Sequence, residues 1–367
     1  MHQFSSLRFA SLQKYNQQNL VQRNLLHSQI LMLKYFRASF IFTAICLWLA
    51  FYVWWTHALF ITIMLAILEV SLSFDNAIIN AKEIEKMNAV WRRRFLTRWM
   101  IIAVFGMRII FPVAIVSIIW DVSMRQALQI AFQDPSRYQA IIESSHIALA
   151  AFGWSFLFMV FLWFFLDETK KIHWVNVIET KLAKLWKLES IEVIVALLTM
   201  RGVTKLPWFP TTETWIFLTA GIMWLIVFLI ISALSKLLQD QEQSNTNSKW
   251  LAWWFGTFMY LEILDASFSF DGVIWAFALT KNIIIIALWL GIGAMFVRSL
   301  TLMLVEKKTL SHFKYLEHGA FWAIGLLAAI MFLSSTYHIP EVFTWVGSWV
   351  LILIAFLHSK YGKKSHT

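Results

Sequence analysis

An eight-residue acidic pattern occurs twice in this chain, each time inside a long apolar stretch. Residues 68–75 read Leu-Glu-Val-Ser-Leu-Ser-Phe-Asp, and residues 264–271 read Leu-Asp-Ala-Ser-Phe-Ser-Phe-Asp. Carboxylates inside a membrane-spanning segment are costly unless they have partners, so such acids usually mark an ion or proton pathway. Two copies about half a chain apart therefore predict one central polar site that is built from two related halves.

The side chains of the two copies are the oxygen ligands that a hard cation prefers. Glu262, one helical turn before Asp265, adds a further carboxylate on the same face as Asp265. The candidate ligands and supporting hydroxyls are Glu69, Asp75, Glu262, Asp265, Asp271, Ser73 and Ser269.

The spacing within each copy limits how its two acids can meet. Glu69 and Asp75 lie six residues apart, which is roughly 240° around a continuous helix, and Asp265 and Asp271 have the same spacing. Two arrangements remain open. Either the helix breaks near the motif, which Asn76 would suit and which would free backbone carbonyls for a cation, or each acid meets a partner from the other copy.

Arginine and histidine positions extend the repeat over three apolar stretches. Arg108 and Arg298 lie in the stretch that follows each copy, and His146 and His318 open the next one. From each histidine, Ala recurs at +2 and +5, Gly at +7 and Met at +13. We therefore expect two related three-helix units.

The charge balance of this set favours a divalent cation. Five acids outnumber Arg108 and Arg298, which leaves room for a divalent ion and a shared proton and disfavours an anion. No cysteine is available and only His146 and His318 offer nitrogen, so Mg, Mn or Ca fit better than softer metals. A structural alternative is that the acids and arginines are buried ion pairs. We expect Arg108 and Arg298 to serve mainly in that way, and the histidines to be interfacial more often than ligating.

The composition indicates an integral membrane protein. Hydrophobic residues make up 59% of it, charged residues 14%, and the mean hydropathy is +0.65, which excludes a soluble globular protein. Apolar runs of about 20 residues, the length of a helical span, occur at 38–56, 57–82, 99–119, 144–166, 213–235, 250–280, 283–305, 318–335 and 341–358. The sequence thus predicts an all-α bundle of nine or ten transmembrane helices.

The segment 189–209 decides between nine and ten crossings. Its apolar part is short and interrupted by Arg201 and Pro207, so hydropathy alone predicts an interfacial or cytoplasmic helix. If this segment crosses the membrane, most of the 31 Lys and Arg residues lie on the same side of the membrane as both termini. If it does not cross, every later basic loop lies on the opposite side. The positive-inside bias therefore favours ten crossings with both termini cytoplasmic. The repeats would then be five spans apart and inverted.

These spans divide the chain into five regions. We predict a cytoplasmic segment at 1–37, a leading span and first repeat at 38–166, a basic linker with connecting spans at 167–249, a second repeat at 250–335, and a final span with a basic tail at 336–367. The basic clusters lie in short loops, which indicates orientation in a lipid bilayer and not nucleic-acid binding. No nucleotide-binding or hydrolytic motif occurs, so we expect neither an enzyme nor a resident cofactor.

The motifs resemble the paired signatures of the TerC family, named for tellurium resistance. The matching residues run from Glu69 through Ser73-Phe74-Asp75-Asn76-Ala77, and from Asp265 through Phe268-Ser269-Phe270-Asp271; Tyr315-Leu316-Glu317-His318-Gly319 is similar to that family's last repeat. Gly272-Val273-Ile274 departs from the family's usual Ser-Ile-Pro, as in an uncharacterised branch. The resemblance covers roughly residues 40–335.

The resemblance implies a bacterial inner-membrane protein related to small-cation exporters with inverted three-helix repeats, several of which export manganese or other divalent metals. By position it implies Glu69, Asp75, Asn76, Asp265 and Asp271 as ion ligands, with Glu262 matched in some relatives. We therefore expect a secondary transporter that exports a manganese-like divalent cation, with protons as candidate coupling ions. The competing interpretation is a membrane scaffold or a stress-resistance factor that transports nothing.

Overall fold

A computed structural model describes most of the chain. The described residues are 2–72, 74–85, 87, 92–93, 113–114, 116–117, 120–167, 170, 172–185, 190–240, 261, 280, 282–334, 337 and 339–361. Their regular structure is helical throughout, with no strand among them. The predicted all-α, multi-span membrane fold is confirmed.

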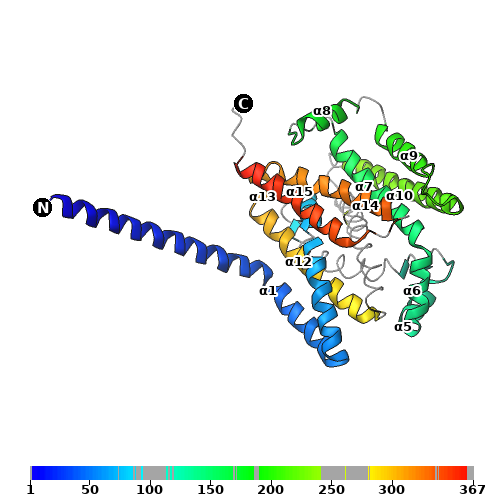
Figure 1. The fold of residues 1–367 in the computed structure, drawn as a ribbon, viewed down its shortest axis with the longest axis horizontal. Helices are drawn as coiled ribbons and strands as arrows, with labels where there is room; N and C mark the ends of the chain where they lie inside the picture. The colour runs from blue at the N-terminus through cyan, green and yellow to red at the C-terminus, as the bar shows by residue number, and fades with distance from the viewer. Residues whose placement is uncertain are drawn as a thin grey trace.

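Figure 1 shows the described helices, of which α7, α10, α12, α14 and α15 coincide with predicted apolar runs. They are α1 His2–Leu72, α2 Phe74–Glu85, α5 Met124–Gln133, α6 Pro135–Ser144, α7 His146–Leu166, α8 Asn176–Leu185, α9 Ile191–Val203, η2 Thr211–Glu213, α10 Thr214–Asp240, α12 Ile283–Glu306, α13 Thr309–His312, α14 Leu316–Ser334 and α15 Glu341–Tyr361.

Six helices in the described ranges are long and apolar enough to cross a membrane. They contain Leu33–Tyr52, His146–Leu166, Thr211–Ile230, Ile284–Glu306, Leu316–Ser334 and Val342–Tyr361. A bent pair, Trp55–Ser71 with Phe74–Glu85, counts as a seventh candidate if its two helices form one span; their axes differ by 47°. The predicted spans 250–280 and 99–119 lie almost wholly outside the described residues.

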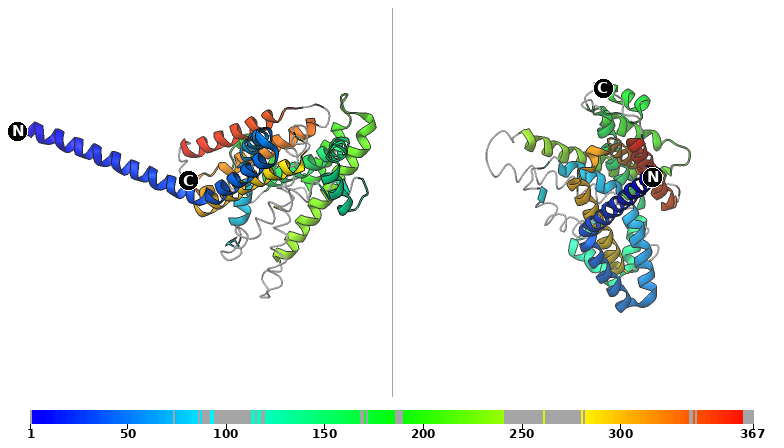
Figure 2. Two further views of the ribbon diagram at one scale, coloured as in Figure 1. Left: turned by 90° about the horizontal axis from the view of Figure 1, so that it is seen from below. Right: turned by 90° about the vertical axis from the view of Figure 1, so that its left-hand side faces the viewer.

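α1 is two helical segments joined at Trp55, whose φ of 65° and ψ of −160° interrupt the helix. Its N-terminal part projects away from the bundle, whereas the part from Leu33 onward forms a hairpin around α12 (Figures 1 and 2). Ser39 Oγ donates to the Met295 carbonyl at 2.7 Å and lies 2.8 Å from Ser299 Oγ. These buried hydroxyls fix the register of α1 on α12, because polar side chains inside a membrane need partners.

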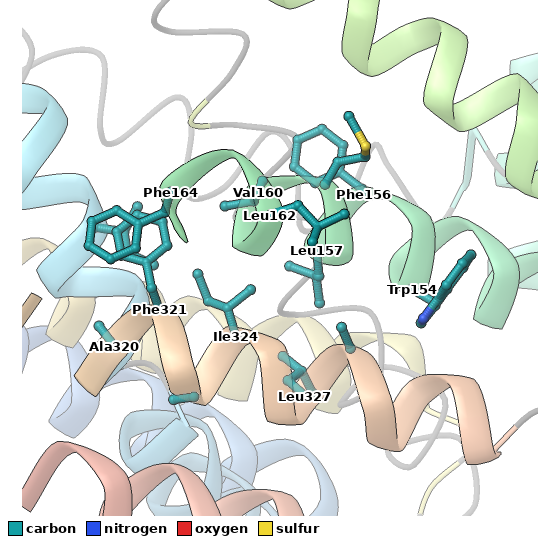
Figure 3. Packing of buried hydrophobic residues seen from close by; sticks show 14 of the residues in the cluster. Trp154, Phe156, Leu157, Val160, Leu162, Phe164, Ala320, Phe321, Ile324 and Leu327 are labelled. Atoms are coloured by element: carbon teal, nitrogen blue, oxygen red, sulfur yellow. The ribbon is translucent and has the colours of Figure 1, made fainter. Parts of the chain in front are cut away.

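α7 and α14, the third spans of the two predicted repeats, pack against each other in opposite directions. Phe164 stacks on Phe321 with 3.8 Å between ring centroids, whereas Trp154 contacts Phe332 at 5.9 Å, so the C-terminal half of one helix meets the N-terminal half of the other (Figure 3). The two glycines at equivalent positions of the repeats both lie against the other helix. Gly153 lies against Met331, and its counterpart Gly325 lies against Phe161. This antiparallel pairing is what an inverted repeat requires.

Several basic segments gather at one end of the bundle, here named the α8 face. Lys82 at the end of α2 pairs with Glu317 at the start of α14. The segment before α8 reaches α15, where Trp174 Nε1 donates to His358 Nδ1 at 2.9 Å. The α8 face thus contains the C-terminal ends of α2, α7, α12 and α15, as the loop-charge argument predicted for one side of the membrane.

The opposite end of the bundle is covered by α5 and α6. Ser123 and Gln126 form a capping box that starts α5, and Pro135 occupies the first turn of α6, where it needs no hydrogen-bond acceptor. Tyr138 of α6 is fully buried together with Trp289 of α12 and Leu65 of α1. The two short helices therefore pack on the ends of the spans that surround Glu69.

The marginal segment 189–209 contains α9, which has 13 residues and is not one of the six candidate spans. It nevertheless runs beside the spans. Met200 lies against Gly221 of α10, and Gly221 lies beside Ser155 near the middle of α7. Farther along, Phe209 contacts Phe217, which also contacts Phe332 at the far end of α14. The segment leads from the α8 face toward the other end.

Candidate acidic site

Glu69 is buried in the middle of the bundle, only 3% exposed. It belongs to the second segment of α1 and lies against Gly293, near the middle of α12. A Cβ at position 293 would overlap the methylene groups of Glu69, so glycine is what lets the acid approach the α12 backbone. Gly293 thus allows a close contact between α1 and α12.

The helix axis bends between Glu69 and Asp75, the region where one of the two sequence-based arrangements places a break. α1 ends at Leu72, α2 begins at Phe74, and the two segments meet at 47°. Asp75 falls in the first turn of α2, where its Oδ1 accepts a hydrogen bond from the Asn76 backbone N–H at 2.8 Å. A carboxylate at this place is favoured by the helix dipole.

Buried amides extend the polar surface from Asp75 along α2. Asn76 is 1% exposed and Asn80, one turn later, is 7% exposed. Among the described residues, Asn80 Oδ1 has no hydrogen-bond partner. An oxygen buried without a partner is costly, which makes Asn80 a candidate ligand that sequence reasoning missed. Its spacing of four from Asn76 was the available signal.

The structure describes only the first half of the candidate site. Ser73, Arg108, Glu262, Asp265, Ser269 and Asp271 lie outside the described residues, so those assignments stay predictions. Arg298 is half-buried on α12, little more than one turn beyond Gly293. Within the described ranges, no group of three or more His, Cys, Asp or Glu side chains could hold a metal ion. A cation site on this plan therefore needs ligands from the second copy.

The two repeated histidines lie at opposite ends of the bundle, away from Glu69. His146 begins α7 at the end covered by α6, and His318 lies in the first turn of α14 at the α8 face. His318 is buried, with its Nε2 donating to the Ile172 carbonyl at 2.8 Å and lying 3.5 Å from Glu179 Oε2. Its position supports a structural role for this histidine and not a ligand role.

Glu179 of α8 is the centre of a network that the sequence did not reveal. It is fully buried, and Oε2 accepts from Lys170 Nζ at 3.2 Å and from the Trp174 N–H at 3.1 Å. Oε1 accepts from the Val175 N–H at 3.1 Å and from Trp322 Nε1 at 3.4 Å. Burial opposes ionisation of Glu179, but the Val175 hydrogen bond and the Lys170 charge outweigh it and lower the pKa of the carboxyl.

Lysine side chains join this network to the stacked rings of α7 and α14. Lys170 Nζ lies 3.9 Å from the Phe164 ring centroid. Lys82 Nζ lies 4.5 Å from the same centroid and also forms an ion pair with Glu317. Burial lowers the pKa of Lys170, and the neighbouring Glu179 opposes that change. Cation–π contacts of this kind stabilise partly desolvated ammonium groups. α2, α7, α8 and α14 are therefore tied together at the α8 face.

Comparison with known proteins gives one match. A protein-family model described as "Protein of unknown function (DUF475)" matches residues 74–366, which includes α2 and every later helix described above. No curated protein and no solved structure matches the chain.

Proposed function

We propose that this chain, which belongs to the DUF475 family and is a multi-span α-helical membrane protein, transports a divalent cation through the acidic site. The proposed substrate is a hard cation such as manganese, and the proposed direction is out of the cytoplasm. The bound ion would be held by carboxylate, amide and backbone oxygens of the two acidic motifs. The resemblance to TerC proteins supports the same assignment.

One observation supports this proposal most strongly: two carboxylates, Glu69 and Asp75, are buried at mid-depth on either side of a broken helix. A fold that needed only stability would gain by placing apolar residues there, because buried charges lose hydration energy that pairing rarely restores. Broken helices that flank buried acids are how secondary transporters expose polar groups to an ion inside the bilayer.

The buried amides give the proposed ion a route. Asn76 and Asn80 lie on one face of α2, which runs from the helix break to the α8 face. α2 ends beside the Lys82–Glu317 pair and the aromatic stack. In this proposal an ion moves along α2, and the charged network at the α8 face closes that end of the path between transport events.

Uptake into proteoliposomes tests the proposal. Purified protein is reconstituted around a metal-sensitive dye, and Mn²⁺, Mg²⁺ and Ca²⁺ are added outside in turn. We expect saturable uptake of at least one of these ions, and loss of that uptake in Asp75→Asn, which keeps the size of the side chain and removes its charge.

Asp121→Asn is the matched control. Asp121 is exposed and has a φ of 48°, a conformation that asparagine adopts readily, so this variant should transport like the wild type. Wild-type vesicles that take up no more of any of the three ions than empty vesicles would contradict the proposal and favour the scaffold alternative.

A further inference from the structure

The last helix, α15, lies outside both repeats but contacts the broken helix of the first acidic motif. Trp349 Nε1 donates a hydrogen bond to the Ser71 carbonyl at 3.0 Å. The Trp349 ring also stacks on Phe74, with 5.3 Å between centroids and 24° between planes. Ser71 lies in the last turn of α1 and Phe74 begins α2, so one side chain contacts both sides of the break.

The hydrogen bond is made to a backbone carbonyl in the last described turn of α1, beside the bend. In a continuous helix the Ser71 carbonyl would accept from the N–H four residues later, but the last carbonyls of a helix lack that donor. An unpaired carbonyl is especially costly inside a bilayer, where no water can replace the donor. The indole N–H of Trp349 supplies a donor to the Ser71 carbonyl, and its ring stacks on Phe74.

α15 packs closely against α14. Its Gly347 lies against Leu326 of α14, and Gly319 of α14 lies against Ala355 and the Leu351 carbonyl of α15. Glycines at both contacts let the two helices approach closely. The position of Trp349 is therefore set by α14, one of the two helices related by the repeat.

We propose that Trp349 is a positioning residue that fixes the bend between α1 and α2, and thereby the relative placement of the Glu69 and Asp75 carboxylates. The two acids lie on opposite sides of the bend, so a change in its angle moves one relative to the other. The effect on the bend follows from the contacts alone. The effect on cation affinity rests on the proposed transport function.

Two variants of Trp349 and two matched controls at Trp345 test this role. Trp349→Phe keeps a ring on Phe74 and loses the donor, whereas Trp349→Leu loses both. Trp345→Phe and Trp345→Leu are controls, because Trp345 lies one turn earlier on α15 and its indole N–H has no acceptor among the described residues. In the uptake assay the half-saturating cation concentration should rise about five-fold in Trp349→Phe, the effect of one lost hydrogen bond. It should rise further in Trp349→Leu and remain unchanged in the controls.

A distance measurement separates this inference from the transport proposal. Cys46 is the only cysteine, so Cys46→Ser allows spin labels at Met64→Cys on α1 and Glu85→Cys on α2, about 30 Å apart at 1.5 Å per residue. Pulsed electron paramagnetic resonance should give one narrow distance peak in the parent. The peak should broaden or shift in Trp349→Leu, and should not change in Trp345→Leu.

The outcomes are distinct. A changed peak with no transport by the parent protein supports the positioning role and contradicts only the transport proposal. An unchanged peak in Trp349→Leu overturns the inference whatever the transport result. A changed peak with unaltered cation affinity in a transporting protein overturns the link between the bend and the site.

Discussion

Glu69 depends on the absence of a side chain at position 293. A Cβ there would overlap the Glu69 side chain, so Gly293→Ala must displace either that acid or the whole segment of α1 that contains it. Overpacking of this kind costs about 1–3 kcal/mol, and we expect the variant to fold with a weaker apparent affinity for the transported cation. Thermal unfolding and uptake kinetics measure the two effects.

Gly202→Ala provides the comparison for Gly293→Ala. Gly202 is also helical, but a Cβ there would meet no atom within 4 Å. Because alanine favours a helix over glycine by about 1 kcal/mol, this variant should be as stable as the parent or more so. Equal uptake affinities in the two alanine variants would contradict the role given to Gly293.

Because of Glu179, the free energy of unfolding should depend on pH in the acid range. Its folded-state pKa lies below the ordinary value of 4.5, so its contribution is complete above that value and is lost as the pH falls toward the lower folded pKa. In Glu179→Gln this part of the acid sensitivity should disappear. At pH 7 the variant should be less stable by about 3–5 kcal/mol, because the buried Lys170 charge loses its partner.

Unfolding midpoints between pH 3 and pH 7 measure this prediction. Adding Lys170→Met to Glu179→Gln should restore part of the lost stability, since the unpaired charge is then removed as well. Glu143→Gln changes an exposed carboxylate that accepts a hydrogen bond from Gln139, and should leave the profile unchanged. A Glu179→Gln profile that parallels the parent at every pH would contradict the assignment.

Among the helices, the α7–α14 pair gives the most direct comparison between the two repeats. Gly153 and Gly325 occupy equivalent positions, but Gly153 faces the flexible end of Met331 and Gly325 faces the rigid ring of Phe161. A methionine end can move aside at little cost, whereas a ring in a packed core cannot. Gly325→Ala should therefore destabilise the protein by about 1–3 kcal/mol and Gly153→Ala by less. The reverse order in thermal unfolding would be inconsistent with this packing.

The duplicated motif was enough to predict several of these helix contacts. Its six-residue spacing required either a break or a partner from the other copy, and a break is found between Glu69 and Asp75. The recurring histidine, glycine and methionine positions predicted two related helices, which pack in opposite directions as α7 and α14. Such patterns are readable because they recur at fixed spacing along the chain.

Glu179 and Trp349 could not be predicted in the same way. Glu179 lies in a polar, basic segment and has no repeated counterpart, and its importance depends on His318 and Trp322, more than a hundred residues away. Trp349 is one of 21 tryptophans, most of which would be expected to anchor the protein at the membrane interface. Only the tertiary contacts separate it from the others.

The direction of the spans makes 189–209 decisive for the topology of the molecule. α7 ends at the α8 face. α14 also begins at that face, and the end of α12, which lies near Tyr35, precedes it directly in the chain. α12 must therefore begin at the other end of the bundle. The chain between α7 and α12 therefore crosses an odd number of times. With the single crossing predicted from the sequence for 250–280, α10 and that segment account for two crossings, and the prediction assigns the third to 189–209. The Phe209–Phe217–Phe332 contacts lead in that direction.

Labelling of single cysteines tests this topology. In a Cys46→Ser background, Lys181→Cys on α8 and Thr212→Cys before α10 introduce exposed thiols on the two sides of α9. A membrane-impermeant maleimide should label them from opposite sides of sealed vesicles, and Ser311→Cys, exposed next to α14 at the α8 face, should label with Lys181→Cys. If Thr212→Cys and Lys181→Cys react from the same side, 189–209 does not cross. The inverted relation of the repeats would then require a second crossing within 241–282.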